Sequence, residues 1–351
     1  MSRPATSARA VAVQVLERVA VQGAFASRAL DGELARARLD DRDAALATEI
    51  VYGTLRVLPE LDARIRAHLR RDPDSMDSVL RAALRAGCYQ LMHLSRVPTH
   101  AVVNESVGIV RSARGSGLAG MANAVLRKLA LARPAEPEQP RRIALPRAAA
   151  LALTRSLDPV RRTAWLDQAA ISPPLCLRVR LGLDRAAIAN ELRAARPGAL
   201  VRESQVSPLA LLLARAGDPR ALPGYAEGRF SVQDEGAQIV GLCLGARKGE
   251  AVADLCAGHG GKTTLLCEAV GATGEVLAVD LDERKLDRIP LELTRLGLAA
   301  ERVERRAIDL TVGQGGLGAR FDRVLVDAPC TGLGTIGRRP ELLLRFAAED
   351  P

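Results

Sequence analysis

A glycine-rich loop is the first feature of this sequence that suggests chemistry. Residues 254–263 read Asp-Leu-Cys-Ala-Gly-His-Gly-Gly-Lys-Thr and follow a short apolar run, which places the loop at the end of a buried strand. Glycine lets backbone N–H groups come close to a ligand. A phosphate-binding Walker loop needs a glycine where Cys256 stands, and the loop's glycines lack the spacing of a dinucleotide fingerprint. For the loop alone, a plain turn stays open as the alternative.

Acidic residues end the strands that follow this loop. Asp280 ends the apolar run 275–280, and Asp309 ends the next expected strand, over 302–309. A carboxylate at the first position can accept hydrogen bonds from both hydroxyls of a ribose, and the second stands where an adenine edge would lie. Each acid alone is more often a helix cap. Together with a loop that fails as a phosphate loop, they predict a site for S-adenosylmethionine.

A third motif, Asp327-Ala-Pro-Cys330, follows the fourth expected strand, over 321–327. Carbon 5 of cytosine is a poor nucleophile. A thiolate that adds to carbon 6 activates it, and a carboxyl group bonded to N3 stabilises the charge that develops. Cys330 and Asp327 supply these two groups, so the motif points to methylation of a pyrimidine ring carbon. A small buried residue is the alternative role for a lone cysteine. We expect that role for Cys88, Cys176, Cys243 and Cys267.

Strands and helices must alternate to place these residues. Strands are expected at 251–256, 275–280, 302–309 and 321–327. Helices are expected from Lys262 to about Val270 and from the residues after Asp280 to Leu296, with Pro290 kinking the second helix or starting it late. The alternation predicts a parallel, doubly wound α/β sheet whose ligands bind at the carboxyl ends of its strands.

The front of the chain has a different pattern. Residues 7–130 carry apolar residues at helical spacing and few prolines or glycines, which predicts an all-α bundle. The proline-rich segment after it predicts a linker. A small α/β module should follow, with strands at 175–180 and 199–202 around a helix at 184–195. The expected domains are 1–132, the linker 133–146, 147–230 and 231–351.

Charge is distributed unevenly along the 351 residues. The net charge is +9, and 46 of the 50 basic residues are arginines, which genomic base composition can also produce. Residues 1–234 carry a net charge of +12, and residues 235–351 carry one of −3. This distribution fits a polyanion held by the front of the protein and equally fits a solvated basic surface.

Several function classes are disfavoured. No apolar run approaches the roughly 20 residues needed to span a bilayer, and the N-terminus lacks the apolar core of a secretion signal. We therefore expect a cytoplasmic protein without membrane contact. Separately, we expect a monomer. The six cysteines form no C-x-x-C pair and no histidine cluster accompanies them, so neither a disulfide framework nor a metal site is expected.

Taken in order, these motifs resemble the RsmB/NOP-type (Fmu or Sun) family of RNA cytosine-5 methyltransferases. The segments LATEIVYGTLR (46–56), VPTHAVVNESVGIVR (97–111) and NAVLRKL (123–129) look like a NusB-like helical domain. GRFSVQDEGAQ (228–238) looks like the entry to the catalytic domain, and DLCAGHGGKT, AVDLDERKL and DAPCTGLGTIGRRPE match the motifs that follow. The resemblance implies a multi-domain protein: an all-α NusB-like bundle, a small RNA-binding module, and a Rossmann-like methyltransferase domain whose sheet is incomplete at its C-terminal end.

The resemblance also implies roles for individual residues. Cofactor contacts are expected at Cys256, Ala257, Gly258, His259, Gly260, Gly261, Lys262, Asp280, Asp309 and Asp327. Asp327 would also contact the cytosine, and Cys330 would help to release the methylated product. The family's nucleophile is a second cysteine in a Thr-Cys motif beyond Cys330, and the sequence, which is cut short in this respect, does not include it.

The expected activity is S-adenosylmethionine-dependent methylation of carbon 5 of a cytosine in 16S ribosomal RNA, by a form that carries the second cysteine. The 351 residues themselves are expected to bind the cofactor weakly and to turn nothing over. Two departures from the family pattern are Gly258-His259 in place of Ala-Pro and Arg180 in place of Asn. The alternatives are a non-catalytic RNA-binding protein with a degenerate methyltransferase fold, a P-loop NTPase, and an enzyme in which Cys330 is itself the nucleophile, as in DNA cytosine-5 methyltransferases.

Overall fold

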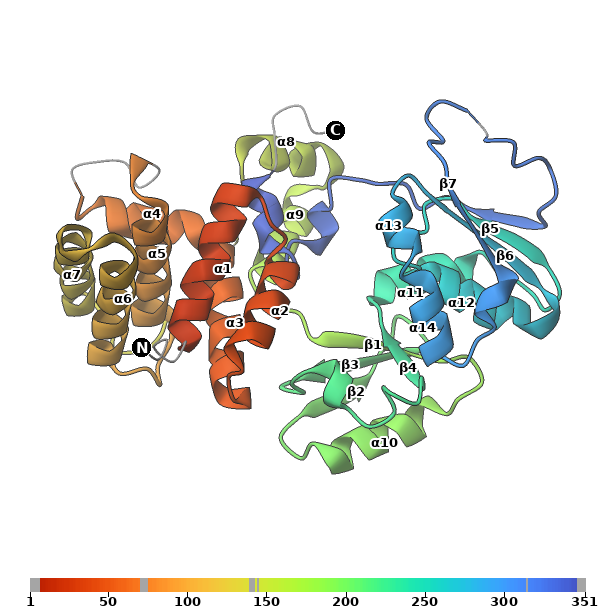
Figure 1. The fold of residues 1–351 in the computed structure, drawn as a ribbon, viewed down its shortest axis with the longest axis horizontal. Helices are drawn as coiled ribbons and strands as arrows, with labels where there is room; N and C mark the ends of the chain where they lie inside the picture. Colours follow the sequence, from red (N-terminus) through yellow and green to blue (C-terminus); the bar gives the residue numbers. More distant parts are fainter. Residues whose placement is uncertain (1–6, 70–74, 139–142, 144, 314, 346–351) are drawn as a thin grey trace. The chain divides into compact units, whose positions relative to one another are not determined.

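The computed structural model describes residues 7–69, 75–138, 143, 145–313 and 315–345. Its internal contacts separate the chain into two units, whose elements are labelled in Figure 1. The first unit comprises residues 1–173 with 331–351, and the second comprises residues 174–330. The segment 133–173 therefore groups with the helical front, and the expected middle module groups with the parallel sheet. The finer division into four domains stays a prediction.

The front of the first unit is a bundle of helices, as predicted. Its helices are α1 (Ala8–Gln22), α2 (Ala26–Ala37), α3 (Asp41–Arg56), α4 (Leu58–Arg66), α5 (Ser78–His93), α6 (Thr99–Arg114) and α7 (Ser116–Leu131). Helix α5 lies at the centre and packs against α1, α6 and α7, so it is buried along most of its length. Side-chain oxygens of Ser7, Asp40 and Asp77 accept hydrogen bonds at the starts of α1, α3 and α5, where free N–H groups need partners.

Two further helices and a returning segment complete the first unit. The described residues of the expected linker (133–138, 143, 145 and 146) form no helix or strand, and residues 139–142 and 144 lie outside the described residues. Helices α8 (Arg147–Ser156) and α9 (Pro159–Ala169) follow and were not predicted, because few of their residues are buried and the apolar spacing is weak. The short helices η5 (Leu333–Thr335) and η6 (Pro340–Leu344) come from the end of the chain.

The returning segment 331–345 is anchored in the helical unit. Ile336 is buried in one apolar cluster with Ile143 and Ala170. The backbone N–H of Ala26 donates to Glu341 Oε1 at 3.3 Å, where the start of α2 favours a negative charge. The guanidinium of Arg345 stacks on the ring of Phe25 at 3.9 Å. The segment 331–345 is thus held by contacts with the start of α2 and with the apolar cluster that follows the bundle.

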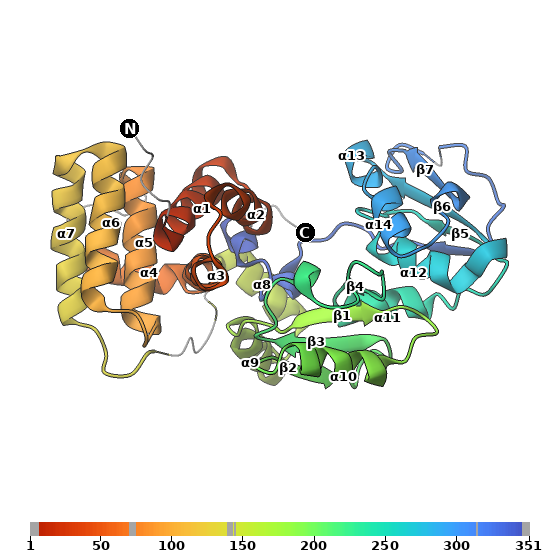
Figure 2. The same cartoon turned by 60° about the horizontal axis from the view of Figure 1, so that its bottom comes forward.

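The second unit begins with an antiparallel sheet. Its strands β1 (Leu175–Val179), β2 (Leu200–Glu203), β3 (Ala210–Ala214) and β4 (Phe230–Val232) have the order β2-β3-β1-β4. Helix α10 (Arg185–Ala195) lies along one face of this sheet (Figure 2). The turn η2 (Pro219–Ala221) follows β3. Strands β3 and β4 were not predicted, because β3 is a continuous apolar run without alternation and β4 has three residues.

The second sheet is parallel, as predicted. Its strands β5 (Ala251–Asp254), β6 (Glu275–Asp280), β7 (Val303–Ala307) and β8 (Arg323–Leu325) have the order β7-β6-β5-β8. The chain therefore moves outward from β5 to β7 and returns to the other side of β5 with β8. Such an order change opens a crevice at the carboxyl ends of the strands on either side of it.

Helices cover one face of this parallel sheet. They are α12 (Gly261–Val270), α13 (Glu283–Leu286) and α14 (Ile289–Arg295), with α11 (Glu235–Cys243) packed beside α12. The turns η3 (Gly271–Thr273) and η4 (Ala300–Arg302) connect them to the strands. Pro290 stands in the first turn of α14, which confirms the expected break in the helix after Asp280. Described residues of the segment 308–321 cover the other face.

A buried ion pair joins the antiparallel sheet of the second unit to α12, the helix that covers the parallel sheet. Arg178 of β1 donates to Glu268 of α12 at 2.9 Å, and the side chains are 0% and 3% exposed. Arg178 also donates to the hydroxyl of Thr264 at 2.9 Å. In a second contact between these parts, the guanidinium carbon of Arg295 in α14 lies 4.1 Å from the centre of the Tyr225 ring. The middle module and the parallel sheet thus share buried contacts.

In the described part of the chain no helix is long and apolar enough to cross a membrane.

Candidate functional site

The predicted loop connects β5 to α12 at the order change of the parallel sheet. Gly258 and Gly260 have φ angles of +55° and +85°, which favour glycine. A Cβ atom added at Gly260 would lie 2.7 Å from Cγ1 of Ile289, so no larger residue fits there without a shift. A Cβ atom added at Gly258 would meet nothing within 4 Å. The loop therefore has one side packed against α14 and one side facing open space that a ligand can fill.

Asp280, at the end of β6, accepts a hydrogen bond from this loop. Its Oδ2 accepts a hydrogen bond from the N–H of Gly258 at 2.9 Å. Its Oδ1 accepts from the N–H of Asp282 at 3.0 Å and from Lys285 Nζ at 3.1 Å. Burial alone would raise the pKa of Asp280, but these hydrogen bonds outweigh it and hold the pKa below its ordinary value. Asp280 is therefore an ionised acceptor at the edge where the sequence places the cofactor's ribose.

Asp254 lies beneath the loop and is 1% exposed. Its Oδ2 accepts from the hydroxyl of Thr263 at 2.7 Å, and its Oδ1 is buried without a hydrogen-bond partner. Burial raises the pKa of Asp254, although Thr263 and the nearby Lys262 oppose the shift. The residue begins the motif, but sequence reasoning did not assign it to the site. An acid that ends a strand directly before a glycine loop was the available signal.

Lys262 and Asp327 form an ion pair that joins the loop to the Pro-Cys motif. The lysine side chain is 19% exposed and the aspartate 44%. They come from the carboxyl-end sides of β5 and β8, the two strands at the order change. The structure thus brings together two predicted cofactor contacts. The carboxyl group of Asp327 therefore lies beside the cation of the cofactor loop.

Asp309 is placed differently from the other predicted acids. Its Oδ1 accepts from the N–H of Thr311 at 2.9 Å and from the Thr311 hydroxyl at 2.6 Å. These bonds lower the pKa of Asp309 and cap its own turn. The backbone N–H of Ile308 donates to the carbonyl of Asp280 at 3.1 Å, which sets the end of β7 beside the end of β6. Asp309 therefore follows the correct strand, with its carboxylate engaged locally.

The cysteines differ in exposure. Cys330 is exposed and Cys256 is partly exposed. Burial, together with the carboxylates of Asp254, Asp280 and Asp327, raises the pKa of the Cys256 thiol, so it stays neutral. Cys88 and Cys176 are buried and Cys267 is partly buried. The expectation of a buried role was wrong for Cys243, which is exposed because it ends α11 on the outer side of the helix.

The residues present fit S-adenosylmethionine. Asp280 offers carboxylate oxygens at a strand end, where ribose hydroxyls can donate. Gly258 leaves open space at the loop, and the side chains of Asp254, Asp280 and Asp327 give this edge a negative character that suits a sulfonium cation. Among the described residues, no group of three or more His, Cys, Asp or Glu side chains could hold a metal ion.

Two family models match the chain. Residues 6–131 match the NusB family, and residues 241–350 match the family described as 16S rRNA methyltransferase RsmB/F. The first match covers the helical bundle, and the second covers the parallel sheet with the loop and the Pro-Cys motif.

Similarity to known proteins extends over nearly the whole chain. A Mycobacterium tuberculosis protein named as a methyltransferase (MT1451) is 36% identical over 376 residues, which cover 99% of this chain and 78% of that protein. Ribosomal RNA small subunit methyltransferase B of Pseudomonas putida is 34% identical over 333 residues, which cover 89% of this chain and 72% of that protein. The crystal structure of PH0851 has a TM-score of 0.76 at 21% identity, over 99% of this chain and 80% of that one, and shows the same fold.

Sequence and structure agree in this assignment. The parallel sheet places the loop, Asp280 and the Pro-Cys motif along one edge, and the relatives share the chain from the helical bundle to the end of the sheet. The cofactor of this fold and motif set is S-adenosylmethionine. The chain belongs to the RsmB/F family of S-adenosylmethionine-dependent RNA methyltransferases, with a NusB domain at its front.

Proposed function

We propose that this protein methylates carbon 5 of a cytosine in 16S ribosomal RNA, in a form that also carries the family's Thr-Cys cysteine. The observation that carries the proposal is the ion pair between Lys262 and Asp327. It joins the cofactor loop to the motif that holds Cys330, so a methyl donor and a target base would meet at one edge of the sheet. The names of the similar ribosomal RNA methyltransferases support the choice of substrate.

Each residue then has a role at this edge. Bound S-adenosylmethionine supplies the methyl group. The loop from Cys256 to Lys262 and the acids Asp280 and Asp309 bind and orient the cofactor. The carboxyl group of Asp327 contacts N3 of the cytosine and donates a proton to it, which stabilises the negative charge that develops when a thiolate adds to carbon 6.

Release of the product involves Cys330. After the methyl group has moved to carbon 5, a base removes the carbon 5 proton, the bond between carbon 6 and the nucleophilic sulfur breaks, and the electron pair returns to that sulfur. Cys330 is exposed at the end of the Pro-Cys motif, where it can reach a bound nucleotide. We propose that it assists this elimination, while the Thr-Cys cysteine is the nucleophile.

A methyl-transfer assay tests the assignment of the two cysteines. Tritiated S-adenosylmethionine and 16S ribosomal RNA are incubated with the 351-residue chain and with a chain extended through the Thr-Cys motif. We expect transfer by the extended chain only. In that chain Cys330→Ala should slow turnover and trap a protein–RNA adduct, whereas Cys243→Ala, another exposed cysteine, should change nothing. Transfer by the 351-residue chain that Cys330→Ala abolishes would make Cys330 the nucleophile.

A non-catalytic RNA-binding role is the second candidate. The net charge of +12 over residues 1–234 favours it, because a basic front binds a polyanion whether or not chemistry follows. The same assay separates the two functions. Salt-dependent RNA binding by the extended chain without methyl transfer would favour the binder.

A further inference from the structure

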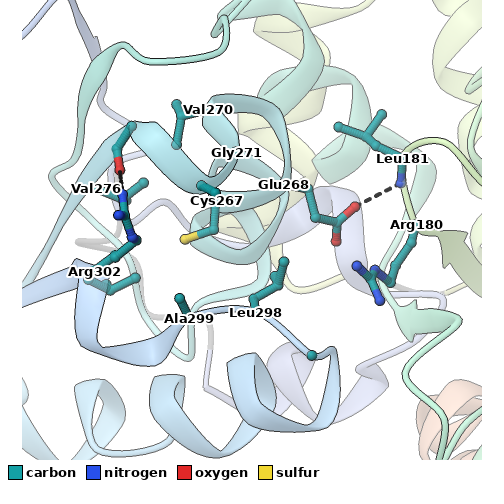
Figure 3. A pocket seen from close by; sticks show the side chains of 14 residues that line it. Arg180, Leu181, Cys267, Glu268, Val270, Gly271, Val276, Leu298, Ala299 and Arg302 are labelled. Carbon is teal, nitrogen blue, oxygen red and sulfur yellow. Dashed lines mark hydrogen bonds between the residues drawn. The ribbon is translucent and has the colours of Figure 1, made fainter.

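A cavity lies at the opposite edge of the parallel sheet from the candidate cofactor site. Its volume is about 280 Å³, and it lies near the starts of β6 and β7, beside the end of α12 (Figure 3). Val270, Val276 and Leu298 are among its apolar lining residues, and Arg180 and Arg302 are the two arginines that line it. The cavity therefore combines apolar walls with two cations, within the second unit.

Glu268 also lines the cavity, and its carboxylate already has hydrogen-bond partners. Oε1 of Glu268 accepts from Nη1 of the buried Arg178 at 2.9 Å, and its Oε2 accepts from the N–H of Leu181 at 2.8 Å. Both oxygens thus have partners that do not belong to the cavity's own cations, as Figure 3 shows for Leu181. Glu268 offsets the charge of Arg178 and leaves the cavity positive.

Arg180 lacks a partner of this kind. Its Nε is buried without a hydrogen-bond partner, and the ion pairs found among the described residues include none with Arg180. A Cβ atom added at Gly297 would lie 3.9 Å from Arg180 Nη1, so the guanidinium lies close to the bare backbone of a turn. Placing a cation in a partly buried position is unfavourable unless an anion or an acceptor offsets the lost hydration.

Arg302 is the second cation of the cavity. Its Nη1 donates to the carbonyl of Gly274 at 3.4 Å, which fixes the side chain but leaves its charge without a carboxylate in the described structure. Burial raises the pKa of the Cys267 thiol, which also lines the cavity, to about 12. The thiol is therefore neutral near pH 7 and does not offset the arginines.

We propose that this cavity binds a phosphate group, with Arg180 as its donor, whereas Arg302 lies at the other end of the cavity and donates to Gly274 (Figure 3). A guanidinium presents N–H groups in a planar fork that matches two phosphate oxygens, and apolar walls strengthen the attraction by excluding water. The phosphate belongs to a free small molecule or to the phosphodiester backbone of RNA. The proposal goes beyond methyl transfer and does not depend on it.

Calorimetric titration tests the proposal on the 351-residue protein. Inorganic phosphate and a dinucleoside monophosphate, which carries one phosphodiester, are each titrated at constant ionic strength, with sodium chloride as the blank. Arg180→Gln should weaken binding by roughly tenfold or more, the size expected for a charge-assisted hydrogen bond, and Arg302→Gln, at the other end of the cavity, should weaken it less. Arg202→Gln, which removes an exposed arginine from β2, should leave binding unchanged and serves as the matched control.

The two ligands distinguish the sources of the phosphate. Tighter binding of inorganic phosphate would identify a small-molecule site, and tighter binding of the dinucleoside monophosphate would identify an RNA contact. Absence of binding above the chloride blank would overturn the proposal, as would binding that Arg180→Gln leaves unchanged. Arg180→Lys keeps the charge without the fork and should retain part of the affinity, which covers the case in which Arg180→Gln fails to fold.

Discussion

The two edges of the parallel sheet present different charged side chains to a ligand. At the carboxyl ends of the strands lie Asp254, Asp280 and Asp327, with Lys262 paired to the last. Near the amino ends lie the arginines of the cavity, beside a glutamate whose oxygens already have partners. A sulfonium cofactor suits the first edge and a phosphate suits the second. If both ligands bind, one sheet holds two sites at opposite edges without a second domain.

Removing the charge of Glu268 should have the largest effect. Glu268→Gln leaves the buried Arg178 without an anion, and we expect a loss of about 3–5 kcal/mol of unfolding free energy. Urea unfolding of the purified protein measures it. Glu275→Gln, at the exposed start of β6, is the control and should change stability little. A loss for Glu268→Gln no larger than for Glu275→Gln would show that the ion pair does not hold the second unit together.

Asp280→Ala should remove most of the cofactor affinity at the other edge. The substitution deletes an ionised acceptor that also orders Gly258, so we expect roughly a 100-fold weaker Kd for S-adenosylmethionine. Calorimetry measures it. Asp309→Ala should cost less, because the carboxylate of Asp309 is engaged with Thr311 in its own turn. Equal losses for the two variants would contradict the different placement of these acids.

Gly260→Ala should strain the cofactor loop. Glycine at φ +85° is replaced by a residue that disfavours this conformation, and its Cβ atom would press on Ile289. We expect a cost of about 1–2 kcal/mol in stability. Gly236→Ala, in α11 with open space around it, should be neutral or stabilising. Thermal unfolding with and without S-adenosylmethionine compares the two, and a neutral Gly260→Ala would contradict the close packing of loop and helix.

The smallest expected effect is a difference in pH dependence between two acids of the same edge. The pKa of Asp280 is lowered in the folded protein, so its contribution to stability is present above the unfolded pKa of about 4 and is lost as pH falls through the folded value. The pKa of Asp254 is raised by burial, so its ionisation reduces stability as pH rises from about 4 through the folded value.

Unfolding at several pH values checks these signs. Asp280→Asn should flatten the loss of stability at acidic pH, and Asp254→Asn should flatten the decrease above the unfolded pKa. The same pH dependence in both variants and the parent would show that neither carboxyl group has a shifted pKa.

The sequence predicted the parts of the site that depend on local pattern. The sequence shows a glycine loop after an apolar run and an acid at the end of the next expected strand. In a parallel sheet this pattern predicts β5 next to β6, with Asp280 beside Gly258. The break at Pro290 followed from the missing N–H of proline. The helical bundle followed from apolar spacing. These features are set by residues that lie close together in the sequence.

Features that depend on distant contacts were not predictable. The pairing of Lys262 with Asp327 requires β8 to lie next to β5, which no local pattern states. In the sequence, Asp309 looks like any other acid at the end of a strand. Its hydrogen bonds to Thr311 could therefore not be predicted. Cys243 was expected to be buried, but its exposure depends on which side of α11 meets the sheet. The anchoring of the segment after Cys330 by the helical unit likewise joins residues far apart in the chain.

Binding of S-adenosylmethionine to the 351-residue protein tests the central assignment most directly. Calorimetric titration with S-adenosylmethionine, and separately with ATP and magnesium, compares a methyl-donor site with a phosphate loop at the same glycines. We predict saturable, micromolar binding of S-adenosylmethionine that Asp280→Ala removes, and no binding of ATP at the loop. Binding of ATP that Lys262→Ala abolishes, without binding of S-adenosylmethionine, would contradict the assignment.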